Sequence, residues 1–123
     1  MIVPVDLMRG MLLGGVAHGI GAALLECFLY DDAGQPLAGT LLDYPMPSTL
    51  DVPSVKMVEH CTPSPLTSHG QKGAGEAGYM GSGAAVANAV NDALRPLGIR
   101  CETLPIRLGE LGERLALHRT RTH

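Results

Sequence analysis

A glycine-rich segment directly before a periodic apolar stretch constrains the fold of this chain more than any other feature. The segment covers residues 68–78 and reads SHGQKGAGEAG. From residue 81 to residue 97, apolar side chains recur at the spacing of one helical face, and Pro96 and Gly98 mark the end of the pattern. The sequence therefore predicts a loop over 62–78 that runs straight into a helix over 81–97.

A second helix is predicted over 14–28, where apolar residues again recur on one face. That face comprises Val16, Ile20, Ala23, Leu24, Cys27 and Phe28. Four glycines lie in or just before this helix: Gly14, Gly15, Gly19 and Gly21. Each interior glycine costs about 1 kcal/mol relative to alanine. The cost is offset if another backbone, or a ligand, lies against the glycine side of the helix.

The remaining segments alternate turn residues with short apolar runs. They predict a β-hairpin over 28–42, extended chain over 43–53, strands over 55–60 and 101–107, and a last helix over 108–118. This order is typical of one α+β domain over 1–123, with two main helices packed on a small mixed sheet. Within 108–123, the helix is expected to give way to a frayed tail.

Glycine is abundant and aromatic residues are scarce. The 123 residues include 16 Gly, three Tyr, one Phe and no Trp. Small residues allow backbones to approach closely but fill little volume. Two alternatives follow: a neighbouring segment or chain completes the core, or a small core of Ala, Val and Leu suffices.

Charge and cysteine patterns exclude several classes of function. The formal net charge is −3, and no basic stripe interleaves with aromatic residues, so nucleic acid is not an expected partner. No apolar run reaches the roughly 18 residues of a membrane span, and residues 1–13 lack a signal-peptide pattern. We therefore expect a cytoplasmic protein. Cys27, Cys61 and Cys101 are too widely spaced for a zinc motif, and no metal site made by this chain is predicted.

The glycine-rich segment also carries chemistry. Free backbone N–H groups at the positive end of a helix bind anions, and Lys72 adds a positive charge. Glu76 is different, because its carboxylate would repel a bound phosphate. We interpret the segment as one that binds an anionic cofactor and also presents a carboxylate base.

The segment also allows three other interpretations. Residues 73–78 match GxGxxG, but no strand is predicted before them and Asp92 falls inside the next helix, which disfavours a dinucleotide-binding motif. A P-loop is disfavoured because Lys72 is followed by Gly73, where Ser or Thr is required. In a purely structural role, the glycines only form turns and Glu76 only stabilises the helix N-terminus.

An ordered set of motifs resembles the molybdenum-cofactor subunit of the xanthine dehydrogenase, aldehyde oxidase and carbon monoxide dehydrogenase family. The central motif is Gly70-x-Lys72-Gly73-x-Gly75-Glu76. Its flanks agree in order and spacing with the C-terminal part of that subunit; they are residues 14–21, 30–40, 43–47, 59–65, 84–94 and 103–106. The resemblance covers roughly residues 10–107.

The resemblance implies roles for individual residues. In the family, the glutamate of this loop is the active-site base beside molybdenum, which implies that Glu76 is catalytic. Residues implied to contact the pterin cofactor are Lys72, Gly73, Ala74, Gly75, Gly14 and Gly15. The implied cofactor is molybdopterin with molybdenum, in its cytosine dinucleotide form. The implied reaction is the oxidative hydroxylation of an aldehyde, an N-heterocycle or a CO-like substrate.

Two hypotheses about function follow. In the first, the chain completes a molybdenum hydroxylase together with the remainder of the molybdopterin subunit and with iron–sulfur and FAD subunits, and alone it has neither cofactor nor activity. In the second, it is a non-catalytic remnant or a small module that binds a partner, including a second copy of itself. The intact 72–76 segment favours the first. Met11, where the family commonly has Gln, and the absence of the other cofactor-binding segments favour the second.

Overall fold

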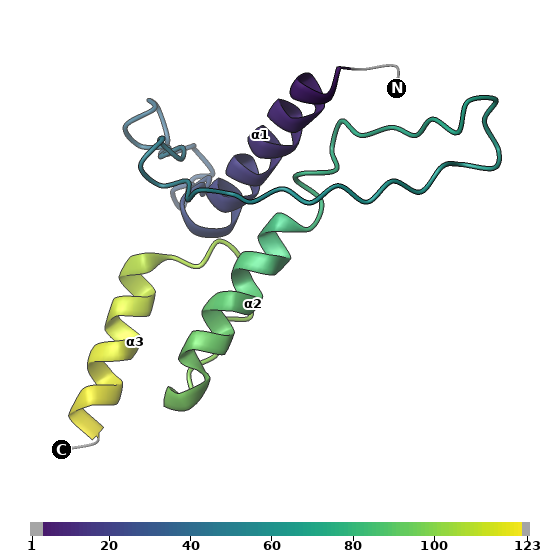
Figure 1. Cartoon of the computed structure of the whole chain (residues 1–123). Helices are drawn as coiled ribbons and strands as arrows, with labels where there is room; N and C mark the ends of the chain where they lie inside the picture. The colour runs from purple at the N-terminus through teal and green to yellow at the C-terminus, as the bar shows by residue number, and fades with distance from the viewer. Residues whose placement is uncertain (1–3, 122–123) are drawn as a thin grey trace.

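The computed structural model describes residues 4–121. It contains α1 (Val5–Leu24), α2 (Ser82–Leu94), a short 3-10 helix η1 (Arg95–Leu97) and α3 (Leu108–Arg121). Between α1 and α2, residues 25–81 form a long irregular connection, parts of which project from the helices as extended loops (Figure 1).

The expected α+β fold, with two helices on a small mixed sheet, is wrong: residues 4–121 contain no β-strand. The predicted strands 55–60 and 101–107 have no regular structure, and the predicted hairpin over 28–42 is reduced to one bridge between Tyr30 and Pro36. A strand is stabilised by hydrogen bonds and side-chain contacts with another strand, and a lone two-stranded hairpin is marginal in water. The described chain offers these segments no sheet to join.

The observed helices agree with the sequence-based predictions better than the strands do. The predicted helix over 81–97 is α2 followed by η1, and it ends at Gly98, whose φ of 66° lies in the left-handed region. The predicted helix over 108–118 lies within α3. The helix predicted over 14–28 is α1, which begins earlier and ends earlier than expected. Residues 5–13 add apolar side chains without a clear stripe, so periodicity could not locate its start.

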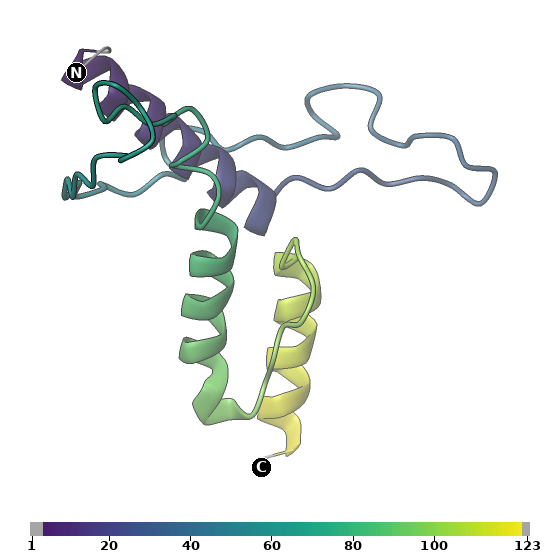
Figure 2. The ribbon, with the colours of Figure 1, turned by 90° about the vertical axis from the view of Figure 1, so that its right-hand side faces the viewer.

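The segment between η1 and α3 reverses the chain direction and links all the helices. Residues 98–107 run back alongside α2, so that α2 and α3 point the same way (Figure 2). The side-chain amide of Asn91 clamps the backbone of Cys101, accepting from its N–H at 2.8 Å and donating to its carbonyl oxygen at 2.9 Å. At its far end, the Ile106 N–H donates to the Ala23 carbonyl oxygen at 2.7 Å. The reversal therefore ties α3 to α1 and α2.

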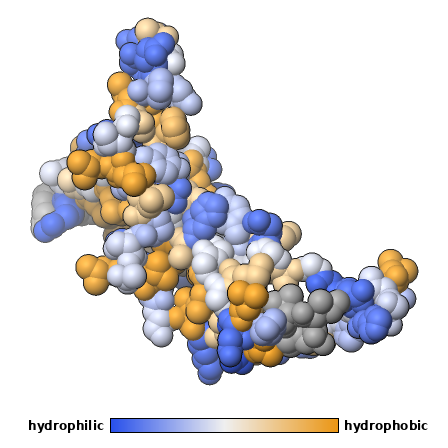
Figure 3. Space-filling model, turned by 90° about the horizontal axis from the view of Figure 1, so that it is seen from above, coloured by the Kyte–Doolittle hydropathy of each residue, from blue (hydrophilic) through white to orange (hydrophobic). Residues whose placement is uncertain are grey.

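The core at this junction is small. Its buried hydrophobic side chains are Ile20, Ala23, Leu94 and Ile106. Many large apolar side chains are exposed instead, including Leu42 at 94% and Leu50 at 95%, and hydrophobic side chains are spread over the surface in Figure 3. Of the two alternatives for the core, this distribution favours completion by a neighbour, because a folded protein rarely leaves so much apolar surface uncovered.

Helix α1 is unusual in being apolar on nearly all sides. By length and composition alone it could cross a membrane. Only 22% of its most apolar stretch is buried against the rest of the described chain. No run of this kind was predicted from the sequence, whereas α1 reaches the necessary length and apolar composition even with Asp6 and Arg9 inside it. Core helices of soluble proteins meet the same criterion, so the feature is weak evidence. Its best-defined contacts are with the chain segment that carries Glu76.

Candidate functional site

The segment with the predicted catalytic glutamate forms a series of turns that leads directly into α2. The carbonyl oxygen of Glu76 accepts hydrogen bonds from the N–H groups of Tyr79 and Met80 at 3.0 and 3.1 Å. These bonds fix the backbone of Glu76 at the entrance to the helix. Its side chain is exposed, and within residues 4–121 its carboxylate has no hydrogen-bond or ion-pair partner. The carboxylate is therefore free to accept a proton from a bound molecule.

Free hydrogen-bond donors lie immediately before this glutamate. In the described part of the chain, the backbone N–H groups of Gly73, Ala74 and Gly75 have no acceptor. Lys72 is exposed, and its ammonium donates to the hydroxyl oxygen of Thr62 at 2.7 Å. Three unpaired N–H groups that directly follow a lysine in the chain suit an anionic or strongly polar group, which is the chemistry expected of a pterin cofactor with phosphate groups.

Helix α1 holds this segment through backbone contact. A Cβ added to Gly15 would lie 2.8 Å from both the carbonyl carbon of Gly78 and the nitrogen of Tyr79. A Cβ on Gly78 would in turn overlap the carbonyl oxygen of Leu12, and one on Gly19 would overlap the Cβ of Ser82. Real Cβ atoms do not approach other atoms this closely, so only glycine allows the two segments to touch. The glycine side of α1 thus faces the loop of the same chain.

Side chains reinforce the contact on either side of these glycines. The rings of His18 and Tyr79 stack with centroids 4.3 Å apart and planes inclined by 23°. The hydroxyl of Ser82 donates to the carbonyl oxygen of Gly78 at 2.5 Å. Nothing in the periodicity of the sequence singled out Tyr79, Ser82 or His18 for this contact. The one hint in the sequence was a ring next to a glycine in each segment, His18 before Gly19 and Tyr79 after Gly78.

The other predicted cofactor contacts lie at this junction or near it. A Cβ on Gly14 or on Gly73 would meet no atom within 4 Å, so neither residue is required to be glycine by packing. Gly15 faces Gly78 and Tyr79, as described above. Met11 also reaches the loop, since its Cε would lie 4.0 Å from a Cβ on Gly75. Contact of Gly14 and Gly15 with a cofactor stays a prediction.

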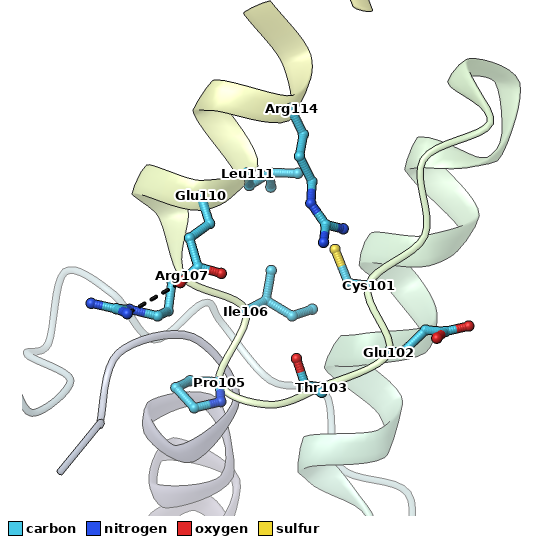
Figure 4. A pocket seen from close by; sticks show the side chains of 9 residues that line it. All are labelled: Cys101, Glu102, Thr103, Pro105, Ile106, Arg107, Glu110, Leu111 and Arg114. Atoms are coloured by element: carbon cyan, nitrogen blue, oxygen red, sulfur yellow. Dashed lines mark hydrogen bonds and ion pairs between the residues drawn. The ribbon is translucent and has the colours of Figure 1, made fainter. Parts of the chain in front are cut away.

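A hollow elsewhere in the molecule is not lined by any of these residues (Figure 4). It is lined by the reversal and by α3, including Cys101, Ile106 and Leu111. Arg107 and Glu110 form an ion pair at its rim, 3.1 Å apart. Within residues 4–121, no group of three His, Cys, Asp or Glu side chains is placed to bind a metal ion. The hollow contains no feature that points to chemistry.

Comparison with known proteins places these features in a family context. Residues 3–53 match the model of the molybdopterin cofactor-binding domain. The chain is 43% identical over 106 residues to the nicotine 6-hydroxylase large subunit of Paenarthrobacter nicotinovorans, covering 85% of this chain and 13% of that protein. It is 31% identical over 115 residues to the carbon monoxide dehydrogenase large chain of Afipia carboxidovorans, covering 91% of this chain and 14% of that one.

Solved structures agree with this. Quinoline 2-oxidoreductase from Pseudomonas putida 86 superposes with a TM-score of 0.84 and 44% identity, covering 88% of this chain and 14% of that chain. A Cu,Mo-CO dehydrogenase superposes with a TM-score of 0.83 and 29% identity, covering 93% of this chain and 15% of that chain. The chain spans only 12% to 14% of the length of the curated relatives it matches, so the described fold corresponds to one segment of those proteins. The match to the nicotine 6-hydroxylase subunit covers 85% of the 123 residues. A stretch of that length includes residues 72–76 wherever in the chain it begins.

Proposed function

The chain belongs to the family of molybdopterin-binding large subunits that includes xanthine dehydrogenase, aldehyde oxidoreductase and carbon monoxide dehydrogenase, and from this membership we propose that it supplies the catalytic base of a molybdenum hydroxylase. The observation that carries the proposal is the arrangement of residues 72–76. A carboxylate without a partner follows three free N–H groups and an ammonium, on a loop that α1 holds by backbone contact.

The proposed division of labour follows from the chemistry of these groups. When bound, the molybdenum–pterin cofactor supplies the redox chemistry of hydroxylation. Lys72 and the N–H groups of residues 73–75 hold anionic or polar parts of that cofactor. Glu76 accepts a proton at a carboxylate oxygen as the substrate is hydroxylated, and base catalysis of this kind contributes about 10²–10⁴-fold to the rate. The glycine contacts with α1 keep the carboxylate in position.

We propose an N-heteroaromatic compound as the substrate. The identity is 43% to nicotine 6-hydroxylase and 44% to quinoline 2-oxidoreductase, two enzymes named for substrates with an aromatic nitrogen ring. It is 31% to the large chain of carbon monoxide dehydrogenase and 35% to an aldehyde oxidoreductase subunit of Escherichia coli. These values support a heterocycle over an aldehyde or CO.

The working enzyme in this proposal is an assembly. The chain functions together with the remainder of a molybdopterin subunit and with iron–sulfur and FAD subunits, in the cytoplasm, and the cofactor is the cytosine dinucleotide form of molybdopterin. The large uncovered apolar surface supports association with more protein.

A reconstitution experiment tests this function. The quinoline 2-oxidoreductase large subunit, with its matching segment removed, is expressed together with this chain and the other subunits of that enzyme. We expect the complex to contain molybdenum, measured by mass spectrometry, and to reduce a dye with quinoline, whereas the chain alone does neither. Molybdenum and turnover in the isolated chain would contradict the proposal, and so would an assembled complex that lacks both.

Lys72→Ala is expected to reduce cofactor retention in this complex. Removing a charged donor from an anion site costs about 1.5–3 kcal/mol, which corresponds to roughly 10–100-fold weaker binding. Molybdenum and pterin content after dialysis measure the effect. Lys56→Ala is the matched control, because Lys56 is also exposed but lies outside the glycine-rich loop. Equal retention in both variants would make Lys72 an ordinary surface charge.

A further inference from the structure

The hairpin that failed to form a sheet has a well-defined turn. The Asp31 carboxylate accepts hydrogen bonds from the N–H groups of Ala33 and Gln35 at 2.9 and 2.8 Å. The N–H of Gly34 donates to the Asp31 carbonyl oxygen at 2.9 Å, and Gly34 has a φ of 78°. This is the geometry of a three-residue hairpin loop, a type I turn followed by a left-handed residue. The turn therefore sets the register of the two arms without help from a sheet.

That register determines which backbone groups face outward. The bridge pairs Tyr30 with Pro36, and its two hydrogen bonds run from the Asp31 N–H to the Gln35 oxygen and from the Leu37 N–H to the Leu29 oxygen. In such an antiparallel pair, the N–H and C=O of the bridged residues point away from the partner arm. On one side of the hairpin, Pro36 has no N–H to offer. On the other side, Tyr30 offers both a donor and an acceptor, so the hairpin has one blocked edge and one open edge.

Three of the four Phe and Tyr rings of the chain cluster at the arm that contains Tyr30. The sequence has only three Tyr and one Phe. Phe28 stacks obliquely on Tyr30 and on Tyr44, with centroids 5.8 and 5.5 Å apart. Phe28 is 57% exposed and Tyr30 is 59% exposed. The Tyr44 hydroxyl donates to the Glu26 carboxylate at 2.8 Å, which raises the pKa of Tyr44 and anchors the cluster to the end of α1. Aromatic side chains that cluster on the surface of an isolated protein are typical of sites that become the buried centre of an interface.

We propose that the Tyr30 edge is completed by a strand from the remainder of the large subunit, with the rings of Phe28 and Tyr30 covered in the process. Main-chain hydrogen bonds would fix the added strand, and the rings would supply apolar contact. The inference rests on the proposed function for the identity of the partner. This chain corresponds to 14% of the solved quinoline 2-oxidoreductase chain, which leaves most of such a subunit to provide the strand. A second copy is the weaker choice, because an edge of a few residues buries too little surface to hold a dimer by itself.

Amide exchange tests the inference directly. Hydrogen exchange at the Tyr30 N–H is measured in the isolated chain and in the complex with the truncated quinoline 2-oxidoreductase subunit described above. We expect exchange to be at least about 100-fold slower in the complex, as for an amide in a stable sheet. The Ala38 N–H, on the side blocked by Pro36, serves as the internal reference and should change less. Equal exchange at Tyr30 in both samples overturns the inference.

Proline substitution provides a second test. Tyr30→Pro removes the outward N–H but neither of the two hydrogen bonds that join the arms, whose donors are Asp31 and Leu37. It should weaken association with the truncated subunit by at least about tenfold. Ala38→Pro, the matched control on the blocked edge, should leave association unchanged. Equal association of the two variants overturns the inference, as does protection of Tyr30 only in a homodimer. A complex that forms normally but lacks molybdenum and turnover would count against the proposed function alone.

Discussion

Glu76→Gln is expected to lower kcat of the assembled enzyme by at least about 10²–10⁴-fold, the range of a general base, while assembly and cofactor content stay unchanged. Glutamine preserves the size of the side chain and most of its hydrogen bonds, but it cannot accept the proton. The free carboxylate also means that the substitution breaks no contact within residues 4–121. Steady-state kinetics with quinoline, together with molybdenum and pterin analysis of the same preparation, measure both quantities.

Glu113→Gln is the control for this experiment. Glu113 is an exposed carboxylate on α3, outside the glycine-rich loop, and it should leave kcat unchanged. In the alternative structural role, Glu76 only stabilises the N-terminus of α2, and its loss costs a few tenths of a kcal/mol in folding with no effect on chemistry. A Glu76→Gln enzyme with nearly full kcat would therefore remove Glu76 from the mechanism.

Local patterns predicted the helices because a helix makes its hydrogen bonds within itself. The stripe from Val86 to Leu97 and the stop at Gly98 sufficed to place α2 and η1. The start of α1 was missed for an equally local reason. Pro4 is its N-cap and makes no side-chain capping bond, and the following turns are apolar without a clear stripe. Neither of the usual signals for a helix start was present.

The strands could not be predicted from this sequence in the same way. The alternating residues around Val55 and Leu104 are suited to a pleated surface, but a strand forms only where another backbone pairs with it. The turn at Gly34 formed as expected because its bonds are local, while the ladder beyond the Tyr30 bridge did not. The sequence pattern was that of a sheet, but residues 4–121 contain no strand with which these segments could pair.

In the candidate site too, local features could be predicted from the sequence and contacts between distant segments could not. The 72–76 loop stood out from its composition, which indicates free N–H groups and an unusual carboxylate. Its support did not stand out, because glycines such as Gly15 indicate that something approaches closely but not what approaches. Only the structure identifies Gly78 and Tyr79, far along the chain, as that neighbour. It also shows that the backbone expected against the glycine side of this helix belongs to the same chain, at Gly15 and Gly19.

Gly15→Ala is accordingly expected to destabilise the chain and to impair the enzyme. The new methyl group would be forced against the backbone of Gly78 and Tyr79, where neither atom can move without displacing the loop. Overpacking of this kind costs about 1–3 kcal/mol. In the assembled enzyme, displacement of the base by about 1 Å should lower kcat/KM by roughly 10²-fold.

Gly10→Ala makes the stability measurement specific, because Gly10 lies in the same helix and a Cβ there would meet no atom within 4 Å. Both substitutions gain the same intrinsic helix propensity, about 1 kcal/mol, so Gly10→Ala should stabilise the chain. The difference in unfolding free energy between the two variants then isolates the clash at Gly15, since the shared propensity cancels. Denaturant unfolding of the chain without cofactor also separates packing from any cofactor contact of Gly15. If the two variants were equally stable, the backbone contact between α1 and the Glu76 loop would not exist in solution, and the positioning of the base would need another explanation.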